Sequence, residues 1–192
     1  MILSRGKKAP RPPLLGLAER TAEVFQAFEA FIREPADNGA ALVLQAAIRF
    51  EEALKALPAP GTSLAAERRL ERTIIRGFEE AVLSARLAAD ETLRFGADAA
   101  PFAPMAEALA FADQDLASAM RKDKDWAQAL VRARKYEGNF QVLHRRALEA
   151  LLSHPNVVTL LKTKEILKRF SDAGLRLGQA AEALGELYSR NP

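Results

Sequence analysis

The segment that decides the fold is 164–188, KEILKRFSDAGLRLGQAAEALGELY. Its apolar residues recur at steps of three and four, which places them on one face of a helix. They are Ile166, Phe170, Ala173, Leu177, Ala180, Leu184 and Leu187. Beside them runs a row with Gly174, Gly178 and Gly185. Glycine inside a helix costs about 1 kcal/mol against alanine, so we expect these three to allow close packing of another helix. The segment predicts a buried helix packed on two sides.

The same pattern occurs earlier in the chain, at a constant offset of 92 residues (166 − 74). Ten positions within 74–90 match ten within 166–182, and six of the ten are identical. Further matches at an offset of 88 residues (101 − 13) relate 13–33 to 101–121 in the same order. We interpret the chain as a tandem repeat of a three-helix unit, with repeat one at about 13–95 and repeat two at about 101–190.

The composition favours helices, because alanine, leucine, glutamate and arginine dominate the 192 residues. We expect helices at about 13–33, 40–57, 62–95, 104–122, 126–153 and 156–190. Candidate caps are Asp37 or Asn38 for the second helix, Thr62 or Ser63 for the third, Asp123 or Asp125 for the fifth, and Asn156 for the last. Short connections favour antiparallel neighbours. The prediction is therefore an all-α, six-helix up-and-down bundle.

Two groups of basic residues stand out in a chain of net charge +3. Lys7 and Lys8 belong to a proline-rich stretch, 1–12, that we expect to be a disordered arm before a single helical domain at 13–192. The second group, Arg68, Arg69, Arg72 and Arg76, lies on the expected third helix. Each group is either a solvated surface or a contact for an acidic partner or anionic lipid.

Several function classes are disfavoured by the residues. The chain has no cysteine and two histidines, and it lacks phosphate-cradling glycine motifs. We therefore expect that the protein is not an enzyme. Acidic residues interleave the arginines and no stacking aromatics accompany them, so nucleic acid is not an expected partner. With no apolar run of spanning length and no secretory core, the protein is expected in the cytoplasm.

The segment 136–184 is similar to the PhoU-like proteins, in particular the accessory proteins of Pit-type phosphate transporters. The likeness lies in YEGNFQVLHRRAL at 136–148, in KEI at 164–166, and in Asp172, Ala173, Arg176 and Ala181. The resemblance implies a cytoplasmic helical bundle, located at the inner face of the membrane, that docks on a phosphate transporter and regulates it.

The resemblance also implies metal ions, held in that family by carboxylates four residues apart on a helix. This chain departs from that pattern: Glu137 is followed by Gln141, and no Glu-x-x-x-Asp pair occurs in the sequence. Glu137, Gln141 and His144 share one helical face and can offer only a mononuclear site, while a surface histidine is the simpler interpretation. We expect no cofactor.

Two functions remain open from the sequence. The first is a non-catalytic regulator of phosphate transport that contacts its membrane transporter with Arg68, Arg69, Arg72, Arg76, Lys7 and Lys8. The basic residues would face the anionic inner leaflet. The second is a helical adaptor or homodimerisation scaffold without a transporter, in which the glycine row forms a seam between subunits.

Overall fold

In the computed structural model, which describes residues 12–58, 65–122, 124–152 and 156–190, the chain is a bundle of helices without a strand among those residues. The helices are α1 (Pro12–Arg33), α2 (Asp37–Lys55), α3 (Ala65–Phe95), η1 (Ala100–Phe102), α4 (Ala103–Arg121), α5 (Trp126–Leu152) and α6 (Val157–Arg190). The prediction of an all-helical bundle is confirmed.

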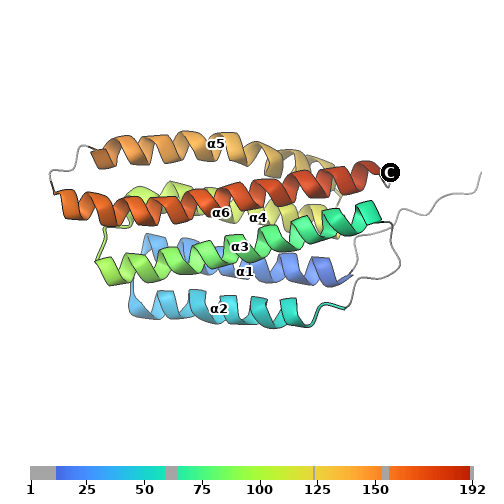
Figure 1. The fold of residues 1–192 in the computed structure, drawn as a ribbon, viewed down its shortest axis with the longest axis horizontal. Helices are drawn as coiled ribbons and strands as arrows, with labels where there is room; N and C mark the ends of the chain where they lie inside the picture. Colours follow the sequence, from blue (N-terminus) through green and yellow to red (C-terminus); the bar gives the residue numbers. More distant parts are fainter. Residues whose placement is uncertain (1–11, 59–64, 123, 153–155, 191–192) are drawn as a thin grey trace, which may run out of the picture.

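The six long helices form two groups of three that pack against each other (Figure 1). In one group α1, α2 and α3 contact one another, and in the other α4, α5 and α6 do so. The groups meet where α3 packs on α6 and α1 packs on α4. Ion pairs from Arg33 to Glu107 and from Arg121 to Glu19 join opposite ends of α1 and α4, so these two helices are antiparallel.

The core consists of the apolar stripes that the sequence marks. Every member of the 164–188 stripe is buried, and so is the inner face of α1. Phe170 lies in the middle, with its ring centroid 5.0 Å from that of Phe28 and 5.4 Å from that of Phe102. Phe170 therefore joins α6 to α1 and to η1.

The helix ends agree with the sequence in part. Asn156 caps α6 as expected, because its side-chain oxygen accepts hydrogen bonds from Val158 N at 2.9 Å and Thr159 N at 3.1 Å. The expected cap of α2 is wrong: this helix begins at Asp37 after Ala36, which makes no side-chain cap. Thr62, Ser63 and Asp123 lie outside the described residues, as does the arm at 1–11.

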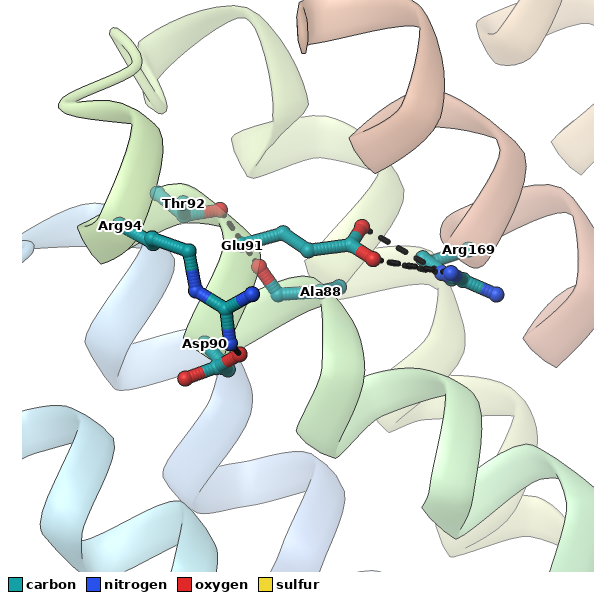
Figure 2. A network of polar contacts seen from close by, with 6 residues as sticks. All are labelled: Ala88, Asp90, Glu91, Thr92, Arg94 and Arg169. Carbon is teal, nitrogen blue, oxygen red and sulfur yellow. Dashed lines mark hydrogen bonds and ion pairs between the residues drawn. The ribbon is translucent and has the colours of Figure 1, made fainter.

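The α3–α6 contact is held at one point by an ion pair of two side chains that are mostly shielded from solvent. Arg169 donates to both carboxylate oxygens of Glu91, at 2.9 to 3.3 Å, and the side chains are 28% and 12% exposed (Figure 2). Neighbouring Asp90 pairs with Arg94 on the same helix, and both of those side chains are more than half exposed. The two pairs differ mainly in their burial.

We expect Arg169→Met to lower the free energy of unfolding by about 2 kcal/mol, between the cost of breaking an exposed pair and that of breaking a buried one. The substitution leaves the Glu91 carboxylate shielded without its partner. Arg94→Met is the matched control and should change stability by less than about 0.5 kcal/mol. Urea unfolding of both variants measures the difference; equal effects would contradict the structural role of the Glu91–Arg169 pair.

Candidate functional site

The arginine cluster, defined as Arg68, Arg69, Arg72 and Arg76, lies on the first three turns of α3. Residues at these spacings neighbour one another on a helix surface. The four side chains line a surface hollow of about 470 Å³. Arg68 is half-buried and the other three are exposed. The fold thus gathers four guanidinium groups around one open hollow.

Most arginines of the described chain are neutralised by carboxylates, but three of the four in this cluster are not. Eleven form ion pairs, namely Arg20, Arg33, Arg49, Arg76, Arg86, Arg94, Arg121, Arg132, Arg169, Arg176 and Arg190. Arg68, Arg69 and Arg72 form no ion pair with a described residue. Because a guanidinium presents several donors in a planar fork, these three are suited to bind carboxylate or phosphate oxygens of another molecule.

Arg76 differs from the other three. It donates to Glu80 at 2.6 Å, and the hydrogen bond and charge of that carboxylate raise the pKa of Arg76. Glu80 also pairs with Arg176 of α6 at 2.6 Å. Arg76 is therefore part of a contact between α3 and α6, and it borders the three arginines that pair with no carboxylate in the described part of the chain.

The predicted glycine row of α6 faces α5 of the same chain. A Cβ atom on Gly174 would come within 2.8 Å of the Phe140 ring, and one on Gly178 would lie 3.3 Å from a carboxylate oxygen of Glu137. A Cβ on Gly185 would meet Arg134 at 3.7 Å. The row therefore permits packing between α5 and α6. It is covered, so the idea that it forms a seam between subunits is wrong.

The three candidate metal ligands do not form the kind of carboxylate cluster that the family resemblance implies. Glu137 lies against Gly178, Gln141 is exposed, and His144 is half-buried with its pKa lowered by desolvation. Among the described residues, no three His, Asp or Glu side chains gather to form a candidate metal-binding group. A divalent cation prefers several oxygen ligands, and this face offers one carboxylate.

A buried carboxyl group on α4 was not expected from the sequence. Asp113 is fully buried, neither of its carboxylate oxygens has a hydrogen-bond partner among the described residues, and burial raises its pKa well above the usual value. A signal existed in the sequence, because Asp113 continues the apolar spacing of Leu109, Leu116 and Met120. A charged residue on a core-facing stripe is unusual.

Two apolar hollows of about 350 and 310 Å³ lie between α2 and α3. Arg86 lines both, and it pairs with Glu51 across the two helices at 3.3 Å. The exposed side chains of Leu44 and Leu83 lie at their margins. Together they form a broken groove, in contrast to the close contact between α5 and α6.

The chain matches no family model, and no curated protein is significantly similar to it.

Proposed function

We propose that this protein is a non-catalytic accessory protein that docks on a membrane transporter through its arginine cluster. The observation that carries the proposal is the gathering of Arg68, Arg69 and Arg72, none paired with a described residue, around one hollow. Guanidinium groups that no described carboxylate neutralises favour an acidic surface on another molecule and increase its rate of association. The partner surface is therefore expected to carry carboxylates or phosphates.

The resemblance to PhoU-like proteins supplies the finer part of the proposal. It suggests that the partner is a Pit-type phosphate transporter and that the protein acts in the cytoplasm at the inner face of the membrane. The tandem-repeat interpretation supports it, since the helix pairs that join the two groups, α1 with α4 and α3 with α6, are equivalent in the two repeats. The bundle would then regulate transport by binding and not by chemistry, because the sequence offers no nucleophile–base set.

We expect the triple substitution Arg68→Gln, Arg69→Gln and Arg72→Gln to weaken retention of the membrane partner at least about tenfold. Arginine is enriched among the interface residues whose truncation costs more than about 1 kcal/mol, and about 1.4 kcal/mol is a tenfold change in affinity. The measurement is the amount of partner that co-purifies with tagged protein from gently solubilised membranes. Helical content and melting temperature should stay unchanged, because none of the three side chains pairs with a described residue.

The charge-matched control replaces Lys55, Lys124 and Lys135 with glutamine. These lysines are exposed and do not line the hollow, and their removal lowers the net charge by the same amount. Full retention in the control and loss in the arginine variant would support the assignment. Equal retention in both variants would exclude the arginine cluster as the docking surface.

A helical adaptor without a transporter is the second candidate, and the groove between α2 and α3 favours it. Val82, Arg86 and Leu93 stand 92 residues before Gly174, Gly178 and Gly185. Side chains at these α3 positions line the hollows, while glycines at the α6 positions face α5. A partner helix could occupy the resulting groove. Loss of a soluble partner on Leu44→Gln with Leu83→Gln, but not on the arginine substitutions, would favour the adaptor.

A further inference from the structure

Four large aliphatic side chains at the end of the α5–α6 hairpin are more exposed than any others in the described chain. We define them as the apolar tip: Leu152 at 66%, Val157 at 67%, Val158 at 61% and Leu161 at 57% exposure. Leu152 ends α5, and the other three lie in the first two turns of α6. In Figure 1 the start of α6 lies outermost at its end of the bundle. The tip is therefore accessible to a large partner.

Single exposed aliphatic residues are common on protein surfaces, but a group of them in one place marks an interaction site. The core contacts of the first half of α6 are made by Ile166, Leu167 and Phe170, which are buried, and these four side chains lie outside the core. Leaving four aliphatic groups in water is unfavourable, and covering them would be favourable.

Basic side chains stand directly behind the apolar tip. Within the described residues of 145–168 there are five, namely Arg145, Arg146, Lys162, Lys164 and Lys168, against two acidic ones, Glu149 and Glu165. None of the five forms an ion pair with a described residue. Lys162 lies over the ring of Phe95, 5.6 Å from its centroid. The end of the hairpin thus combines exposed aliphatic groups with an excess of positive charge.

The spacing along α6 orders these groups by depth. Val157, Leu161, Lys164 and Lys168 follow one another at steps of four, three and four, so they form one row on the helix surface. At about 1.5 Å per residue, Lys164 stands about 10 Å behind Val157. Peripheral helices insert their apolar groups about 5–10 Å into the boundary between headgroups and acyl chains. When α6 points along the membrane normal and Val157 reaches that depth, Lys164 lies at the level of the lipid phosphates.

We propose that the apolar tip inserts into the surface of an anionic lipid bilayer, with the basic residues behind it contacting the lipid phosphates. The contact is peripheral, since no helix in the described ranges is long and apolar enough to cross a membrane. The positive charge favours a lipid surface over a second copy of this chain as the partner. Two such tips would bring ten basic and four acidic side chains together, and the excess basic ones would repel one another. An anionic headgroup layer supplies the compensating charge.

This inference goes beyond the docking function and does not depend on it. Because α3 and α6 run antiparallel, as their contacts from Gly77 to Ala180 and from Glu91 to Arg169 require, the arginine cluster lies at the opposite end of the bundle. The helix rise places it about 40 Å from the tip. A bundle held by its tip would stand on the membrane with the arginine cluster about 40 Å from the bilayer surface, where the cluster reaches only a part of a protein partner that projects that far from the membrane.

The test is co-sedimentation of the full chain with phosphatidylcholine vesicles that contain or lack phosphatidylserine. We expect binding to the anionic vesicles only, and weaker binding at higher salt. The double substitution Val157→Gln and Leu161→Gln should weaken it at least about tenfold. Lys164→Gln with Lys168→Gln should weaken it about fivefold for each lysine. Retained helical content shows that each variant is folded.

Two controls make the test specific. Val131→Gln with Leu42→Gln removes one valine and one leucine of similar exposure from other helices, and it should bind vesicles as the unsubstituted protein does. The arginine-cluster triple variant should also bind normally. Normal binding by the tip variant, or loss of binding in the arginine variant alone, would overturn the proposal. So would a dimer in solution that dissociates when the tip is substituted.

Discussion

Replacing Gly77 with leucine is expected to lower the free energy of unfolding by about 3 kcal/mol, as overpacking at a close helix contact does. A Cβ atom at this position would stand 2.9 Å from the backbone oxygen of Arg176 and 3.0 Å from the Cβ of Ala180. A backbone oxygen cannot move without moving α6, so α3 would have to separate from it. Urea unfolding monitored by circular dichroism gives the change.

Gly138 is the matched control for Gly77, because it also lies inside a helix but a Cβ there meets nothing within 4 Å. Gly138→Leu should gain about 0.5–1 kcal/mol from helix propensity alone. The two substitutions therefore differ in sign. Stabilisation by both would contradict the close approach of α3 and α6 at Gly77.

Asp113→Leu is expected to raise the free energy of unfolding by about 2 kcal/mol, within the range for removing a buried polar group without a hydrogen-bond partner. The two side chains have the same number of heavy atoms, so leucine fits the site with little change in size. For a chain of this length the melting temperature should rise by about 4–8 °C. Calorimetry of the variant and the unsubstituted protein measures the rise. A lower melting temperature would indicate that Asp113 has a partner in solution.

The same carboxyl group makes stability depend on pH. Burial raises the folded-state pKa of Asp113, so the folded protein keeps a proton that the unfolded chain loses. The free energy that protonated Asp113 adds to folding is fully present below the ordinary carboxyl pKa of about 4. It is lost as the pH rises toward the raised pKa, by up to about 1.4 kcal/mol per pH unit. In the Asp113→Asn variant this position cannot titrate. The difference in unfolding free energy between that variant and the unsubstituted protein should therefore increase as the pH rises above about 4, and a constant difference would exclude the raised pKa.

The helices and the core could be predicted from the sequence because both follow from the spacing of apolar residues. The stripe from Ile166 to Leu187 is buried as a whole, and Asn156 caps α6 as its residue type suggests. The start of α2 could not be predicted in this way. Asp and Asn are preferred at the N-cap position of a helix, which made Asp37 and Asn38 the candidates. The N-cap position of α2 is instead occupied by Ala36, which makes no side-chain cap.

The candidate sites were only partly predictable, because they depend on contacts between helices distant in sequence. The spacing of Arg68, Arg69 and Arg72 is visible in the sequence, but that none of them pairs with a carboxylate of a described residue appears only when the surfaces of the other helices are placed. The same holds for Gly77, whose close contact is with a residue about 100 positions away. The apolar tip was missed because its α6 residues, 157, 158 and 161, fit a helical apolar pattern and only the fold places them outside the core.

The central claim is that the arginine cluster docks this bundle on a membrane transporter, and the partner's identity tests it most directly. Tagged protein should be purified from gently solubilised native cells beside the Arg68→Gln, Arg69→Gln, Arg72→Gln variant, and the bound proteins identified by mass spectrometry. We predict a phosphate transporter that binds the unsubstituted protein and is lost with the variant. Recovery of soluble partners alone, or of the same partners with both proteins, would contradict the account.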